Sequence, residues 1–432
     1  MSRKLYTIKE ICEFIWHIEE KYGLLDFQIS GVNIWQCNRM KIYYMLSIQS
    51  GALQEPHCHI NDVGILKKLY WLLKTVFSHN YFTLSKSDVV VFSHPRVTSV
   101  DGECIDIYTK FFIDDLLKDG VKLTELESPN YGFHKKRKYK FSHHNDWISL
   151  FSNLYAKTIN VKMSDEEKEK LSLVEEEFSV FFGYKINLTS LFAGTLKDFI
   201  AKDTIYRIVF KKIKAKTLYI VVSYFNAPVI SAARGCDMEV IELQHGTFSQ
   251  YHLGYSFPKR KKRLDYFPDK MYVWNQYWKE LIEMPIPDSN MVIDKFRFLE
   301  HEKSRVRHLE KIENQIVVIS QGAIGEEIAN HFLTNIHLFD NADIFYKLHP
   351  GEFDSYISYP SLKILSALEN VTIIKDEIPL YELFASSEYQ VGVFSTALYE
   401  GVEFGCKTIL LNINGIEYMD RFIELNDSVE VI

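Results

Sequence analysis

Two histidines and one Ser-Thr pair stand where predicted strands end, and their chemistry suits group transfer. His245 and His349 each follow an apolar run of strand length, and Ser395 and Thr396 follow another. An imidazole in such a place can take a proton from a hydroxyl, protonate a leaving group or hydrogen-bond a phosphate. Hydroxyls and unpaired backbone amides at a helix start bind phosphate. These residue types therefore point to transfer from a phosphate-linked donor.

The C-terminal third carries the candidate nucleotide-binding residues. Pro350 fixes the turn that presents His349, and the glycine at Gly322 permits close approach of a ligand to the backbone. Glu400, one turn into the predicted helix, could reach a ribose or sugar hydroxyl. The structural alternatives are a surface turn, a plain helix cap and a solvated helix residue. The full candidate set is Gly322, His349, Pro350, Ser395, Thr396 and Glu400.

The upstream part of the chain carries the candidate general base. His245 ends one predicted strand, Glu242 lies three residues before it, and Asp101 follows another strand. Any of the three could deprotonate an acceptor hydroxyl. Arg96 and Gln244 are candidate acceptor contacts. The alternatives are a structural histidine at 245 and, around residue 101, a turn that leads into an edge strand.

The elements that must position these residues are clearest near the C-terminus. Apolar runs of strand length alternate with helical patterns. The predicted strands cover residues 315–320, 343–348, 371–375, 390–394 and 407–412. Strands that are apolar throughout and alternate with helices indicate a parallel sheet covered on both faces. We therefore expect a Rossmann-like domain over residues 290–432.

A similar pattern upstream predicts a second α/β domain over residues 1–285. Its expected strands cover residues 88–92, 217–223, 238–243 and 270–274, and long helices are expected over 163–182 and 190–213. The prolines near residue 285 predict the linker. Two such domains suggest a cleft between them, with ligands at the carboxyl ends of the strands.

Composition excludes several classes of protein. The 432 residues carry 50 basic and 57 acidic side chains, for a net charge of −7, which argues against a broad nucleic-acid-binding surface. The chain has no run of about 18 apolar residues, and its first residues lack the apolar core of a signal peptide. The six cysteines are scattered singly. We therefore expect a cytoplasmic protein with reduced thiols.

One basic run could contact an anionic partner. Its members are Lys259, Arg260, Lys261, Lys262 and Arg263, flanked by aromatic residues. A solvated loop is the usual interpretation, and contact with an anionic acceptor or the inner membrane face is the alternative. No Asp-x-Asp pair follows a strand in a way that would hold a metal–diphosphate complex. We therefore expect no metal and no cofactor.

Two motifs of the C-terminal domain resemble a known group of enzymes. The sequences KLHPGE and VFSTALYEG resemble the His-Pro and Ser-(Ser/Thr) motifs of bacterial sialyltransferases and Kdo transferases. Those enzymes have the GT-B fold of two facing Rossmann-like domains, are inverting and metal-independent, and use a CMP-activated sugar. The resemblance implies that His349 contacts the CMP phosphate and that Ser395 and Thr396 bind it.

A third motif resembles a different group of transferases. IELQHGTF is similar to the Gln-His-Gly or Trp-His-Gly element of capsule-type transferases and CDP-glycerol glycerophosphotransferases, where the histidine is a candidate base. Sialyltransferases carry an acidic motif at the matching place. The resemblance spans residues 215–412 and leaves His245, Glu242 and Asp101 as alternative bases.

Together with these residues, the resemblance implies an inverting, metal-independent glycosyltransferase that uses a nucleotide sugar as a substrate and builds a bacterial surface glycan on a lipopolysaccharide, capsule or lipid-linked acceptor. A CDP-polyol phosphotransferase of the teichoic-acid type is the alternative enzyme. The alternative in which the protein is not an enzyme is a non-catalytic subunit that binds a nucleotide sugar.

Overall fold

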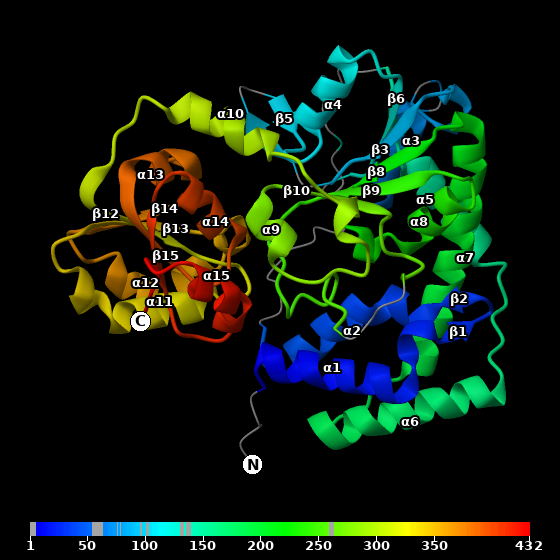
Figure 1. Cartoon of the computed structure of the whole chain (residues 1–432), viewed down its shortest axis with the longest axis horizontal. Helices are drawn as coiled ribbons and strands as arrows, with labels where there is room; N and C mark the ends of the chain where they lie inside the picture. The colour runs from blue at the N-terminus through cyan, green and yellow to red at the C-terminus, as the bar shows by residue number, and fades with distance from the viewer. Residues whose placement is uncertain are drawn as a thin grey trace.

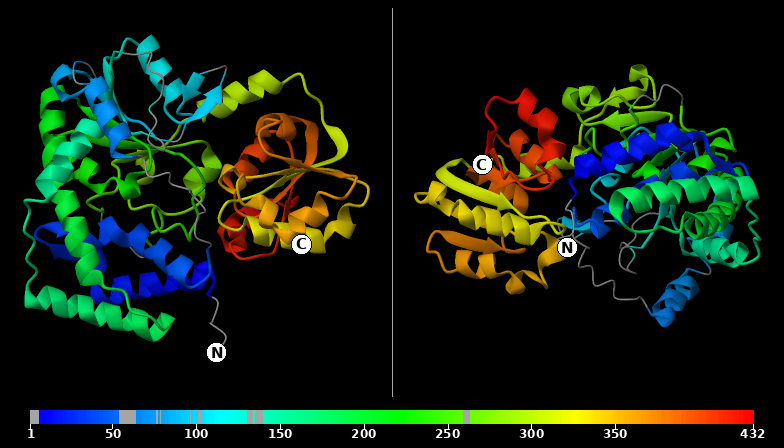
Figure 2. Two further views of the ribbon diagram at one scale, coloured as in Figure 1. Left: turned by 180° about the vertical axis from the view of Figure 1, so that it is seen from behind. Right: turned by 90° about the horizontal axis from the view of Figure 1, so that it is seen from below.

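A computed structural model describes most of the chain as two α/β domains and a helical layer (Figure 1). The described residues are 6–53, 64–75, 77, 79–95, 97–100, 103–129, 134, 140–258 and 263–432. In the two further views the domain that ends the chain forms a lobe of its own (Figure 2). Arg96, Asp101 and residues 259–262 lie outside the described residues, so their expected roles stay predictions.

The C-terminal domain is a six-stranded sheet in the order β14-β13-β12-β15-β16-β17, with every pair parallel. Its strands are β12 (Ile312–Ile319), β13 (Asp343–Lys347), β14 (Val371–Ile374), β15 (Ser387–Gly392), β16 (Lys407–Leu410) and β17 (Glu430–Val431). Its helices are α11 (Gly325–Thr334), α12 (Pro360–Leu365), α13 (Leu380–Ser386), α14 (Thr396–Glu403) and α15 (Asp420–Leu425).

Alternate residues of β12 explain why this sheet is covered on both sides. Ile316 and Val318 pack in one apolar cluster with α11 and α12, whereas Val317 and Ile319 pack in another with α13, α14 and α15. Side chains of a strand alternate between faces, so an all-apolar strand needs helices on both. The Rossmann-like domain expected from the sequence is confirmed.

The N-terminal domain is a seven-stranded parallel sheet in the order β11-β10-β9-β8-β3-β6-β7. Its strands are β3 (Val89–Phe92), β6 (Leu123–Glu127), β7 (Ser142–His144), β8 (Thr217–Ile220), β9 (Glu239–Leu243), β10 (Lys270–Val273) and β11 (Met291–Ile293). The helices nearest to it in sequence are α3 (Ile65–Lys74), α4 (Lys110–Lys118), α5 (Asp146–Ala156), α7 (Leu188–Ile213), α8 (Ala227–Arg234) and α9 (Gln276–Glu280). The α/β class with two Rossmann-like domains is thereby confirmed.

The boundary between the domains lies later than the sequence predicted. Residues 291–293, expected in the C-terminal domain, form β11 and pair with β10 in the N-terminal sheet. The crossing is made by α10 (Arg297–Val306), which carries the chain from one domain to the other (Figure 1). The prolines near residue 285 only shape a connection inside the N-terminal domain. The edge strand expected after residue 101 is present as β5 (Glu103–Ile105), which pairs antiparallel with β4 (Thr98–Val100) in a two-stranded ribbon apart from the main sheet.

A helical layer lies below the N-terminal sheet in Figure 1 and is formed by α1 (Ile8–Tyr22), α2 (Ile34–Gln49), α6 (Asp165–Phe182) and part of α7. A short hairpin of β1 (Gln28–Ile29) and β2 (Val32–Asn33) joins the first two helices. Arg39 of α2 is buried and pairs with Glu19 at 2.6 Å. The Arg39 guanidinium also donates to the carbonyls of Leu253 and Ser256, which holds the loop after β9 against this layer.

Each sheet has a point where the chain order reverses. In the N-terminal sheet it lies between β3 and β8, and in the C-terminal sheet between β12 and β15. Loops at such a point diverge and leave room for a ligand at the carboxyl ends of the strands. None of the helices in the described part of the chain is both long and apolar enough to cross a bilayer.

Candidate functional site

The loop after β9 meets the start of α14 at a direct contact between the two domains. The backbone N–H of Thr247 donates a hydrogen bond to Oγ1 of Thr396 at 3.2 Å. A Cβ atom on Gly246 would lie 3.2 Å from the same oxygen, so only a residue without a side chain fits comfortably here. The structure thus brings the His245 loop and the Ser395-Thr396 pair together, although they are remote in sequence.

His245 lies half-buried in that loop, between two tyrosine hydroxyls. Nδ1 is 3.3 Å from the hydroxyl of Tyr255, and Nε2 is 3.4 Å from the hydroxyl of Tyr224. Tyr255 donates its proton to Oε1 of Glu242 at 2.5 Å. Because a phenol has one proton, the Tyr255 oxygen then accepts from Nδ1–H of His245. That tautomer leaves the lone pair on Nε2, where it accepts from the hydroxyl of Tyr224. A substrate hydroxyl that gave its proton to Nε2 would have to take the place of Tyr224 there.

Glu242 is the buried end of this chain of hydrogen bonds. Its side chain has no exposed surface, and it also accepts from the backbone N–H of Ser223 at 3.2 Å. Burial raises the pKa of the Glu242 carboxyl above its usual range. A fully buried carboxylate cannot touch an acceptor in this arrangement, so Glu242 acts on His245 through Tyr255. This is the logic by which an acid orients and stabilises a catalytic histidine.

Two further aromatic rings flank His245, one from His94 after the end of β3 and one from Tyr108 between β5 and α4. The rings of His94 and Tyr108 have their centroids 6.3 and 6.1 Å from the His245 ring. Asp106 holds both residues, since its carboxylate accepts from the backbone N–H groups of His94 at 2.8 Å and Tyr108 at 2.9 Å. These residues place the end of β3, beside the reversal point, next to His245.

Sequence reasoning did not select His94, Tyr108, Tyr224 or Tyr255 as site residues. The position of His94 directly after a strand was an available signal. The tyrosines carry no such signal, because they reach His245 from loops that only the tertiary fold brings near.

His349 follows β13 at the matching edge of the C-terminal sheet. Its Nδ1 accepts from the backbone N–H of Gly351 at 3.0 Å, within a short 3-10 turn that begins at Pro350. A neutral ring with Nδ1 as acceptor carries its proton on Nε2. The side chain is exposed, so Nε2–H can donate to an anionic oxygen of a ligand.

Gly322 lies against the ring of His349 at the turn after β12. A Cβ atom on Gly322 would approach Nδ1 of His349 to 3.0 Å, so the absence of a side chain lets the ring settle over the turn. Glu352 supports the histidine from below: its Oε2 accepts from the His349 backbone N–H at 2.9 Å. Burial raises the pKa of the Glu352 carboxyl to about 6.

Ser395 caps α14, and its hydroxyl accepts from the backbone N–H of Ala397 at 3.2 Å. β13, β12 and β15 are adjacent and parallel, so His349, Gly322 and Ser395 share one edge of the sheet. Glu400 lies deeper in α14 and is 9% exposed. Its carboxylate accepts from the hydroxyl of Tyr381 at 3.0 Å, which orients it toward α13.

Gln244 is engaged within the protein. It is buried, its Oε1 accepts from the backbone N–H of Trp274 at 2.9 Å, and its Nε2 donates to the carbonyl of Gly246 at 3.0 Å. Gln244 therefore shapes the loop that presents His245. In the basic run, the described Arg263 pairs with Asp269. Among the described residues, the one group of three potential metal ligands includes no residue of this site.

These features define the class of the molecule as a GT-B-like α/β protein of two Rossmann-like domains, in which a loop of one sheet edge contacts a helix start of the other. No protein-family model matches the sequence. The chain is 26% identical over 279 residues to MJ1060, an uncharacterized protein of Methanocaldococcus jannaschii, and the match covers 62% of this chain and 48% of that protein. The chain therefore spans about half the length of the curated relative it matches.

Several solved structures align with about four fifths of the chain. UDP-GlcNAc 2-epimerase from Methanocaldococcus jannaschii has a TM-score of 0.46 at 10% identity, over 80% of this chain and 88% of that chain. The UDP-GlcNAc 2-epimerase from Neisseria meningitidis bound to UDP-GlcNAc has a TM-score of 0.45 at 12% identity, over 79% of this chain and 86% of that chain. MurG of Acinetobacter baumannii has a TM-score of 0.43 at 9% identity, over 80% of this chain and 85% of that chain. With likeness of this order, the activity has to be argued from the residues of the chain itself.

Proposed function

We propose that this protein is a glycosyltransferase that moves a sugar from a nucleotide-activated donor to an acceptor hydroxyl. The hydrogen bond between Thr247 and Thr396 carries the proposal. It joins a loop with a histidine suited to proton abstraction to a helix start suited to phosphate binding. A transfer reaction needs those two functions side by side.

The donor phosphate would lie at the edge formed by Ser395, Thr396 and His349. The first amides of α14 and the positive end of its dipole favour an anion there. Nε2–H of His349 would donate to a phosphate oxygen. As the bond between the anomeric carbon and the phosphate oxygen breaks, negative charge grows on that oxygen, and these donors would stabilise it.

The acceptor would be activated from the N-terminal side. Its hydroxyl proton passes to Nε2 of His245, while its oxygen forms the new bond to the anomeric carbon from the face opposite the departing phosphate. The imidazolium that results is stabilised through Nδ1–H, Tyr255 and Glu242. The configuration at the anomeric carbon is therefore inverted, and none of these steps calls for a metal.

The resemblance of the His-Pro and Ser-Thr motifs supports a finer proposal, namely a CMP-linked donor and a bacterial surface-glycan acceptor. The test is a thermal-shift panel on the full chain with CMP, CDP, UDP and GDP, since a ligand at 100 times its Kd adds about 2.7 kcal/mol to stability. Stabilisation by CMP alone supports the finer proposal, whereas stabilisation by UDP or GDP alone moves the donor to that nucleotide.

The reaction itself is tested by the mass of the product formed with the stabilising nucleotide sugar, in buffer with and without added Mg²⁺ or Mn²⁺. We expect the acceptor to gain the mass of one sugar residue, at the same rate in both buffers. A gain equal to a polyol phosphate, or no turnover with any nucleotide that binds, overturns the glycosyltransferase proposal. A strict need for an added divalent cation overturns the metal-independent mechanism.

A further inference from the structure

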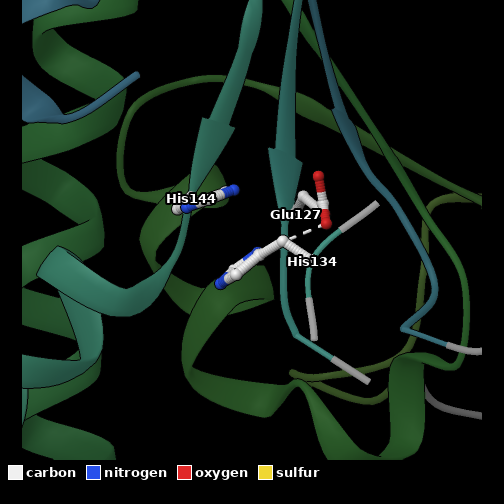
Figure 3. Close-up of side chains that lie close together, drawn as sticks. All are labelled: Glu127, His134 and His144. Atoms are coloured by element: carbon white, nitrogen blue, oxygen red, sulfur yellow. Dashed lines mark hydrogen bonds and ion pairs between the residues drawn. The ribbon is translucent and has the colours of Figure 1, made fainter. Parts of the chain in front are cut away.

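Three buried metal-ligand side chains converge at the far edge of the N-terminal sheet (Figure 3). Glu127 is the last residue of β6 and His144 is the last residue of β7, and the two are paired directly across these parallel strands. His134 comes from the segment that connects the strands. All three side chains are almost completely buried.

Their ligand atoms are close enough to surround one ion, and the separation between His134 and Glu127 matches that of two zinc ligands. Nδ1 of His134 lies 3.3 Å from Oε1 of Glu127, and one ligand atom from each of the three residues lies within 4.8 Å of the others. The two imidazole rings are in contact, with centroids 3.3 Å apart and planes at 18°. Ligands at about 2.0–2.2 Å from a tetrahedral Zn²⁺ ion lie about 3.3–3.6 Å from one another.

Asp146, the first residue of α5, supplies the supporting carboxylate. Its Oδ2 lies 2.9 Å from Nε2 of His134 and 3.8 Å from Nδ1 of His144. A histidine that binds a metal usually directs its other ring nitrogen to a carboxylate, which fixes the tautomer and the ring orientation. With Asp146 at Nε2, the nitrogen of His134 that remains for a metal is Nδ1, the one beside Glu127.

Glu127 and His134 share a hydrogen bond, whereas the close pair formed by His134 and Asp146 is not well aligned. Nε2 of His134 and Oδ2 of Asp146 are buried, and neither atom has a hydrogen bond of acceptable geometry within the described residues. Trp71 stands edge-on to the rings of His134 and His144, with centroids at 4.9 and 5.9 Å, and adds an apolar wall. An ion bound at Nδ1 of His134 would fix the ring with its proton on Nε2, directed at Oδ2 of Asp146.

We propose that Glu127, His134 and His144 bind one Zn²⁺ ion and that Asp146 orients His134 for it. Imidazole nitrogen with carboxylate oxygen is a donor set that suits Zn²⁺. The ion would tie His134 to the carboxyl ends of β6 and β7. β6 is the neighbour of β3, whose end carries His94, so the ion would stabilise the same sheet edge that holds the candidate active site.

The proposal is tested on the full chain, without any substrate. The purified protein is loaded with Zn²⁺, dialysed against metal-free buffer and analysed for metal content, and its affinity is measured by competition with a chromogenic chelator. The variants are His144→Ala, Glu127→Gln and Asp146→Asn. The matched control is His17→Ala, which removes an exposed histidine of α1.

We expect about one Zn²⁺ per chain in the wild type and in His17→Ala. Affinity should fall more than about 100-fold in His144→Ala and Glu127→Gln, which lose a ligand, and about 10- to 100-fold in Asp146→Asn, which keeps its shape and loses only the supporting charge. Circular dichroism confirms the fold of each variant, and Asp146→Asn remains informative if a ligand variant does not fold.

Equal Zn²⁺ content in wild type and in both ligand variants overturns the site, as does a wild-type chain that retains no metal after loading. Retention of Fe²⁺ or Mn²⁺ in preference to Zn²⁺, lost in the same variants, overturns the choice of zinc. These readouts do not depend on the transferase proposal, because they involve neither nucleotide nor turnover.

Discussion

Oγ1 of Thr396 accepts a hydrogen bond from the backbone N–H of Thr247 at 3.2 Å, across the two domains. The acceptor side chain belongs to the first residue of α14, and the donor lies two residues after His245. A proposed phosphate site and a proposed base are therefore linked by one contact. A substitution at either residue should change the binding of both the donor and the acceptor.

Truncation of the Ser-Thr pair should weaken nucleotide binding. In Ser395→Ala/Thr396→Ala the helix start loses both hydroxyls, and hydrogen bonds to a charged group are worth about 1.5–3 kcal/mol. We expect the nucleotide Kd to rise by about that free energy in isothermal titration calorimetry. Thr372→Ala, at an exposed position of β14 in the same domain, is the control and should bind as the wild type does. Unchanged affinity in the folded double variant would remove the phosphate site from α14.

Loss of His245 should stop turnover and spare binding. His245→Ala removes the imidazole that takes the acceptor proton, and general-base catalysis contributes about 100- to 10,000-fold in rate. The measurement is kcat and nucleotide Kd side by side, with His17→Ala as the exposed-histidine control. Near-wild-type turnover of His245→Ala, together with its loss in Asp101→Asn, would transfer the role of base to Asp101.

Tyr255→Phe should show how much the orientation of His245 by Tyr255 contributes to turnover. The variant removes the hydroxyl between His245 and Glu242, and a hydrogen bond of this kind to a charged group is worth about 1.5–3 kcal/mol, or roughly 10- to 150-fold in kcat. KM for the donor should stay unchanged, because the donor lies on the other domain. The acidic limb of the pH–rate profile should move to lower pH, since the imidazolium has lost its acceptor. A fall in stability with an unmoved pH profile would show that Tyr255 is only structural.

Glu352 should make the protein less stable as the pH rises from about 4.5 to 6. Burial raises the pKa of this carboxyl to about 6 from 4.5, so between these values the folded state binds more protons than the unfolded state. Stability then falls with rising pH, by about 2 kcal/mol in total once the pH has passed from well below 4.5 to well above 6. The difference in the free energy of unfolding between wild type and Glu352→Gln, from urea titrations at several pH values, should show this slope.

The control for that series is Glu369→Gln, at an exposed position before β14, for which the difference should stay flat. A flat difference for Glu352→Gln as well would mean that the buried carboxyl ionises as freely in the folded protein as in the unfolded one.

The sequence by itself determined the strands and the residues at their ends. Runs such as 316–319 and 391–394 are apolar at every position, which only a strand covered on both faces can bury, and the carboxyl ends of parallel strands share one edge. From these rules alone His349, Gly322 and Ser395 could be placed at one edge of the C-terminal sheet, and the structure has them there.

Only the tertiary structure decided which residues contact the side chains at those sheet edges. The partners of the contact between Thr247 and Thr396 are 149 residues apart, and Tyr255 and Tyr224 reach His245 from separate loops. The burial of Glu242 also depends on residues distant in sequence. The same is true of the pairing of β11 with the N-terminal sheet. Local propensity and periodicity act over a few residues, whereas hydrogen-bond partners and burial are set by the packing of whole elements, and no short-range pattern encodes them.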